Sequence, residues 1–220
     1  MKTYRKNAVI IGALFIITML VGMIDAYYVA PFLSKPVTNI LQINNQLLTG
    51  AFSVLIMAVG IVFIAITFFP VVKRHSEPVA LTYVILRTIE CVFLVLGSIC
   101  YLYINALGKE HANDIFNYST DIAIALKLKY YGFQIAMVVL GFGSLFLCYA
   151  LYTSKLIPRF LSIWGGIGYL LLFLSAIFEI CGLVDTTKGF GAIMYVPGGL
   201  WELIVFPIWL FVKGFNTNPS

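Results

Sequence analysis

Charged residues are scarce in this chain. They make up 10% of its 220 residues, whereas hydrophobic residues make up 61%. Soluble domains carry about 25% charged and about 45–50% apolar residues. A water-soluble fold of this length could not cover its surface with so few charges. The composition therefore excludes a soluble domain and predicts helices that cross a membrane.

Residues that hold metals or carry out catalysis are also few. The chain has two histidines, and its four cysteines form no CxxC or Cys/His spacing of the kind that holds zinc. It lacks the GxSxG, HExxH and GxGD motifs. We therefore predict no metal and no cofactor, and these absences disfavour an enzyme without removing that class.

Basic residues do not cluster into a run or a stripe, although the formal net charge is +5. They fall in short tails and loops, where membrane topology accounts for them. We expect no nucleic-acid partner. Lipids surround the protein, and the sequence leaves its oligomeric state open.

Six apolar stretches are long enough to cross a bilayer, whose hydrocarbon core is about 30 Å thick and needs about 20 apolar residues in a helix. They span about residues 8–29, 48–72, 78–104, 128–152, 158–184 and 195–212. The first is too long for the apolar part of a typical signal peptide, so we interpret it as a retained span. We predict an all-α, polytopic six-helix bundle that forms one domain over residues 1–220.

The connections between the spans alternate in length. Residues 73–77 and 153–157 form short turns, whereas 30–47, 105–127 and 185–194 are longer. One side holds Lys2, Arg5, Lys6, Lys73, Arg74, Lys155, Arg159 and Lys213, and the other holds Lys35, Lys109, Lys127, Lys129 and Lys188. By the positive-inside rule the first side, with both termini, is cytoplasmic.

The segment 105–127 differs from an ordinary loop. Apolar residues such as Ile115 and Ile122 alternate in it with polar residues such as Asn117 and Asp121. A helix through this segment would be amphipathic. We expect an extra outer element that lies at the membrane interface or caps the bundle.

Ionisable residues inside the spans are the most informative feature, because a charge at a helix centre costs about 2.5–3.5 kcal/mol on insertion scales. Arg87 and Glu90 share one face of the third span, and Glu202 lies in the sixth. A rise of 1.5 Å per residue puts these three, and Gln134, at similar depths of roughly 14–20 Å from the cytoplasmic end.

The set Arg87, Glu90, Gln134 and Glu202 could bind a ligand or serve as a structural ion pair. One arginine faces two glutamates, so either the cluster is net negative or one carboxyl group holds a proton. Three further acids, Asp25, Glu179 and Asp185, lie at the outer ends of spans or just beyond. They could line an outer vestibule, or they could reach lipid headgroups and cap helix ends.

Four sequence segments carry a family resemblance over nearly the whole chain. They are GALFIITMLVG, LRTIECVFLVLG, GFGSLFLCYALYTSKLIPRFLSIWGGIGYLL and PGGLWELIVFPIWLFVKGFN. In their order and spacing they resemble the bacterial membrane-protein family known as domain of unknown function 4386, in which the equivalents of Arg87, Glu90 and Glu202 are typical. The resemblance implies a small protein of a bacterial inner membrane and adds no substrate, reaction or cofactor.

Three classes of function remain open. A transporter or receptor would bind a small polar or cationic ligand, or a proton, at the central cluster. A structural or regulatory membrane subunit would bind no ligand and would use the cluster only for packing. An intramembrane enzyme acting on lipid would need a nucleophile or a metal, and neither is evident.

Overall fold

The computed structural model describes residues 2–29, 31, 44–110, 115–186 and 189–216. Its elements, in chain order, are α1 (Lys2–Met23), η1 (Ile24–Val29), α3 (Asn44–Val72), α4 (Glu77–Glu110), η3 (Ile115–Tyr118), α5 (Ser119–Thr153), α6 (Arg159–Ile180), α7 (Gly189–Leu200), η4 (Trp201–Val205) and α8 (Phe206–Val212). η1 and η4 are π-helical turns and η3 is a 3-10 turn. Strands are missing from the described residues.

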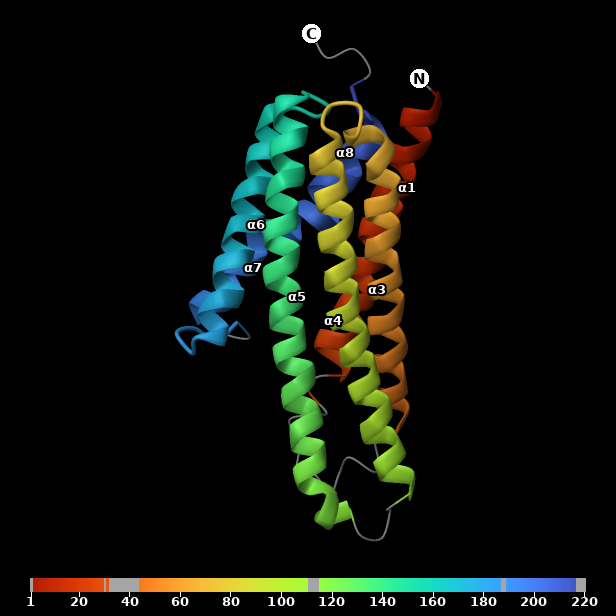
Figure 1. Ribbon diagram of the computed structural model, residues 1–220, viewed down its shortest axis with the longest axis vertical. Coiled ribbons are helices and arrows are strands. Elements are labelled where there is room, and N and C mark those ends of the chain that lie inside the picture. Colours follow the sequence, from red (N-terminus) through yellow and green to blue (C-terminus); the bar gives the residue numbers. More distant parts are fainter. Residues whose placement is uncertain (1, 30, 32–43, 111–114, 187–188, 217–220) are drawn as a thin grey trace.

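These elements form six helices long and apolar enough to cross a membrane, which confirms the predicted helical bundle. Helices that follow one another along the chain, from α1 to α6, pack side by side. The sixth span, made of α7, η4 and α8, crosses the bundle at a slant (Figure 1). It packs on α6 through α7 and on α1 through α8, so its middle, η4, contacts both α1 and α6.

The end of the bundle away from the short turns differs in detail from the expected interfacial element. Residues 105–110 extend α4, and residues 119–127 belong to α5. With 34 and 35 residues, these two helices are about 51 and 53 Å long, against about 33 Å for α6. They therefore reach well beyond the loop that joins α6 to α7 (Figure 1). Residues 111–114, most of the predicted loop 30–47, Lys35 and Lys188 lie outside the described residues.

The start of α1 and the end of α8 lie at the same end of the bundle, as six spans require (Figure 1). The guanidinium of Arg5 donates hydrogen bonds to the carbonyls of Leu210 and Phe211. Asn216 joins the same end to the turn between α5 and α6, because its backbone N–H donates to the carbonyl of Leu156 at 2.8 Å. Both short turns and both ends of the described chain therefore share one side.

An aromatic cluster forms the core around η4, in the middle of the sixth span. Trp201 stacks on Phe206 with ring centroids 4.2 Å apart, and Phe206 stacks on Phe68 at 6.1 Å. Phe15 meets both Trp201 and Phe206 edge to face. Trp201 is fully buried, and its indole N–H donates to the carbonyl of Leu161 at 2.8 Å, so its polar atom is satisfied inside the core.

Glycine allows α6 and α7 to approach at the level of backbone contact. A Cβ atom on Gly168 would lie 2.7 Å from the Cα atom of Gly198, and one on Gly165 would lie 2.7 Å from the indole of Trp201. Small residues at such contacts are how membrane helices gain packing energy without a hydrophobic driving force. The position of the sixth span therefore depends on these glycines.

We expect Gly168→Ala to destabilise the protein by about 1–3 kcal/mol, because the added methyl group meets backbone atoms that cannot rotate away. Gly166→Ala is the matched control, since a Cβ atom there would only touch Cys148 Cβ at 3.8 Å. Thermal unfolding in detergent measures both. Equal unfolding temperatures for the two variants would contradict this account of the α6–α7 contact.

Candidate functional site

Three polar side chains of the central site come from one face of α4. Tyr83, Arg87 and Glu90 are spaced by four and three residues, so they project to the same side of the helix. Arg87 Nη1 lies 2.7 Å from Glu90 Oε2, and Arg87 Nε donates to the hydroxyl oxygen of Tyr83 at 3.0 Å. Arg87 and Glu90 are 3% and 2% exposed, so this is a deeply buried ion pair within one helix.

Glu202 comes to the same region from the sixth span. It lies in η4, and the N–H of Phe206 donates to the carbonyl of Trp201, five residues earlier, which is the π-helical pattern. The sequence explains the widened turn. Pro207 has no N–H to donate, and in a regular helix its ring would clash with the carbonyl four residues earlier. The hydroxyl of Tyr169, on α6, donates to Glu202 Oε1 at 2.7 Å.

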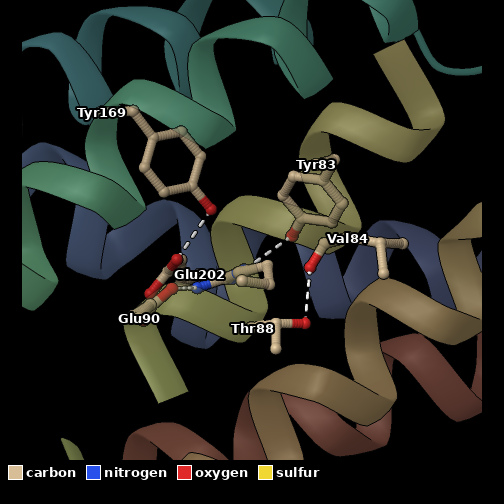
Figure 2. A network of polar contacts seen from close by, with 7 residues as sticks. Tyr83, Val84, Thr88, Glu90, Tyr169 and Glu202 are labelled. Carbon is tan, nitrogen blue, oxygen red and sulfur yellow. Dashed lines mark hydrogen bonds and ion pairs between the residues drawn. The ribbon is translucent and has the colours of Figure 1, made fainter. Parts of the chain in front are cut away.

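Figure 2 shows how these side chains converge, with Tyr169 pointing at Glu202 and Tyr83 approaching from α4. Glu202 is buried and interacts electrostatically with both Arg87 and Glu90. The ion pair of Arg87 is nonetheless formed with Glu90. One guanidinium and two carboxyl groups thus share a buried space, and the hydrogen-bond partner of Glu202 is a neutral hydroxyl.

The depths of these residues agree. Arg87 is ten residues from the start of α4, Tyr169 ten from the start of α6 and Glu202 ten from the end of α8, which puts each about 15 Å from the end of the bundle that holds the short turns. That is the middle of a hydrocarbon core about 30 Å thick. The three residues therefore share one depth in the bundle.

Gln134 does not join this layer, although its predicted depth was similar. It lies 19 residues from the end of α5, and therefore about 28 Å from the same end of the bundle. Its amide nitrogen donates to Thr186 Oγ1 at 3.4 Å, just past the end of α6. The backbone N–H of Thr186 in turn donates to the carboxylate of Glu179. The structure thus groups Gln134 with the outer residues, because α6 ends where α5 continues.

The three acids expected at an outer vestibule occupy two separate places. Asp25 lies in η1, where it accepts a hydrogen bond from the hydroxyl of Tyr101 at 2.5 Å and pairs with Lys129 Nζ at 3.1 Å. Glu179 lies at the end of α6, and Asp185 is exposed in the loop that follows. Asp25 is therefore neutralised beside α4 and α5, away from the other two acids.

Sequence reasoning missed the tyrosines and Lys129. Tyr83 could have been found, because it precedes Arg87 by one helical turn. Tyr169 is one of thirteen tyrosines, and nothing in its sequence separation from Glu202 indicates that the two side chains meet. From the sequence, Lys129 is only a basic residue near the end of a span. In the structure α5 extends past it, and Lys129 forms an ion pair with Asp25.

A family model matches residues 10–214 of the chain, under the description "Domain of unknown function (DUF4386)". The chain belongs to this family. The match covers most of the first span, all of the other five and every residue of the central cluster, and it confirms the resemblance that the four sequence segments carry. The comparisons with curated proteins and with solved structures gave no match. The protein is thus a multi-pass membrane protein of a family defined without an activity.

Removing Arg87 should unbalance the central cluster. We expect Arg87→Leu to lower the free energy of unfolding by about 3–5 kcal/mol, because Glu90 is then left as an uncompensated buried charge. The double change Arg87→Leu with Glu90→Leu should recover part of that loss. Thermal or denaturant unfolding in detergent measures the coupling between the two sites.

The matched control is the pair Lys73–Glu77, whose nitrogen–oxygen distance is 2.8 Å but whose side chains are 47% and 55% exposed. Its double-mutant cycle should give a coupling of about 0–1 kcal/mol, since water screens exposed pairs. Strictly additive losses at Arg87 and Glu90 would show that the buried pair is not energetically coupled.

Proposed function

We propose that this multi-pass membrane protein takes up and releases a proton at Glu202, in the middle of the bilayer. The observation that carries the proposal is the charge count of the buried cluster. Arg87 forms its ion pair with Glu90, and Glu202 receives a hydrogen bond from the neutral Tyr169. An ionised carboxylate in a low-dielectric interior costs several kcal/mol. A proton that Glu202 takes up from water makes the carboxyl group neutral and removes that cost.

Two features distinguish this proposal from a purely structural role. Arg87 and Glu90 lie on the same helix, so their ion pair cannot fix the register of two helices. The hydrogen bond from Tyr169 to Glu202 does join α6 to the sixth span, but the contact of Gly168 with Gly198 already holds these elements together. The Gly168–Gly198 contact therefore holds the two elements together whether or not Glu202 carries a proton. The competing function, a structural or regulatory subunit, is supported by the deep burial of the Arg87–Glu90 pair.

The backbone around Glu202 supports the same proposal. π-helical turns inside longer helices occur frequently at functional sites. Here the turn η4 places Glu202 at the crossing point of the sixth span, between the fully buried Trp201 and Phe206. Protonation that changes the hydrogen bond to Tyr169 would act directly on this irregular turn.

We also propose that the outer mouth of the site is formed by Glu179, Asp185 and Gln134, about 10–15 Å farther out than Glu202. Acidic groups in such a position attract protons and small cations. Asp25 would contribute less to this field, because Lys129 neutralises it. Its role would be to hold η1 against α4 and α5.

The orientation we propose follows from the basic residues that share the end of the bundle with the short turns. They include Arg5, Lys73, Arg74, Arg159 and Lys213. Loops rich in lysine and arginine stay on the cytoplasmic side. With the family resemblance, this supports a bacterial inner-membrane protein whose termini are cytoplasmic.

Reporter fusions test the orientation. A cytoplasm-active reporter at Ser220 should be active, and the same reporter inserted at Asn117 should be inactive, with the reverse for a reporter active only outside. Equal activity at both positions would contradict the proposed topology.

Infrared difference spectroscopy tests proton binding. We expect a carbonyl stretching band of a protonated carboxylic acid that disappears as pH rises and shifts in deuterated water. Glu202→Gln should abolish this band. Tyr169→Phe should shift it, because the hydroxyl that donates to Glu202 is lost.

Glu77→Gln is the control, because Glu77 is exposed at the start of α4, outside the proposed site, and should leave the band unchanged. A band that survives Glu202→Gln would assign the proton to another group. If no carboxylic acid band titrates at any pH at which the protein stays folded, the proposal is wrong and the structural role is favoured. A band lost on adding sodium or potassium at constant pH would mean that a small cation replaces the proton.

A further inference from the structure

A groove of about 310 Å³ runs along the seam between α5 and α6. It is a shallow, open depression lined by Leu145, Cys148, Tyr149, Tyr152, Ile163 and Gly166, with Ser162 beside them. Gly166 makes room for it, since its nearest neighbour is Cys148 Cβ, 3.8 Å from a Cβ atom built on the glycine. The groove is open to the surface, whereas the central cluster is buried; Cys148 of its lining interacts electrostatically with Glu202.

The depth of the groove fixes its surroundings. Tyr152 is one residue from the end of α5, and Leu145 is eight residues from it, so the groove extends from about 2 to about 12 Å above the end of the bundle that holds the short turns. This is the half of the hydrocarbon core nearest the two ends of the chain. Its open side therefore faces the acyl chains of that leaflet.

Two polar groups lie at the shallow end of this apolar groove. The guanidinium of Arg159 lies over the ring of Tyr152, 5.1 Å from its centroid, and the residue is exposed at the start of α6. Ser162, one turn deeper, is only 2% exposed, and within the described part of the chain its hydroxyl has no hydrogen-bond partner. A buried hydroxyl without a partner costs free energy that a ligand acceptor would recover.

We propose that the α5–α6 groove binds a phospholipid with an anionic headgroup. Charge, hydrogen-bond donor and apolar surface follow one another with depth in the order that such a lipid presents its phosphate, ester carbonyl and acyl chain. Arg159 pairs with the phosphate, as guanidinium groups do. The Ser162 hydroxyl donates to the ester carbonyl, and the chain lies along Gly166 and Leu145.

Native mass spectrometry of the full-length protein tests this site, with dioleoyl phosphatidylglycerol and dioleoyl phosphatidylcholine as probes. We expect one phosphatidylglycerol to bind more tightly than phosphatidylcholine. Arg159→Gln should weaken phosphatidylglycerol binding about tenfold, the loss of one charge-assisted hydrogen bond. Arg74→Gln is the matched control, because Arg74 is an exposed residue of the other short turn and lies over the ring of Tyr4 in the same way, at 5.0 Å.

Side chains that fill the groove test whether the acyl chain of the bound lipid lies in it. Gly166→Leu should weaken the binding of both lipids, whereas Gly166→Ala, which adds a single methyl group, should retain most of it. If Gly166→Leu does not fold, Ile163→Trp fills the groove from its exposed side, since Ile163 is 50% exposed.

Four outcomes would overturn the proposal. Equal binding of the two lipids would show that the site does not recognise an anionic headgroup. Equal losses of binding in Arg159→Gln and Arg74→Gln would show that the overall basic charge of this surface, and not Arg159, attracts the lipid. Unchanged lipid binding in folded, groove-filled variants would place the chain elsewhere. A dimer that dissociates in those variants would assign the groove to a second copy of the protein.

Discussion

A single guanidinium faces two buried carboxyl groups inside this bundle, and it forms an ion pair with only one of them. Arg87 lies in the middle of the membrane, where an unpaired charge is costly, and its partner Glu90 comes from the next turn of the same helix. The helix α4 can therefore enter the bilayer with its charge already balanced. The surrounding helices do not need to supply a counter-charge, and Glu202 is left outside the ion pair.

The sixth span is built around that remaining carboxyl group. Pro207 and the π-helical turn η4 interrupt the helix just at Glu202, and the glycine contacts with α6 bring Tyr169 within hydrogen-bonding distance. The aromatic cluster of Phe68, Trp201 and Phe206 fills the adjoining core. At this one depth the helices pack closely, the backbone is irregular and a carboxyl group lies outside the ion pair. These three features together are the reason we propose a function for Glu202.

The sequence predicts the fold well, because apolar length and scarce charges suffice to identify six spans. It also predicts that Arg87, Glu90 and Glu202 converge, since spacing along a helix determines face and depth. The depth of Gln134 was misjudged, because it depends on where α6 ends relative to α5. Tyr169, the Asp25–Lys129 pair and the α5–α6 groove depend on which helices pack together, and hydropathy carries no information about that.

Whether Arg87 pairs with Glu90 and leaves Glu202 outside the ion pair is measured by the stability of two isosteric variants at neutral pH. Glu90→Gln takes the counter-charge from Arg87, so the unfolding temperature should fall clearly. Glu202→Gln removes a carboxyl group outside the Arg87–Glu90 ion pair, and the side-chain amide still accepts the hydrogen bond of Tyr169, so the unfolding temperature should stay the same or rise. A fall for Glu202→Gln as large as that for Glu90→Gln would contradict the account, because both carboxylates would then share the charge of Arg87.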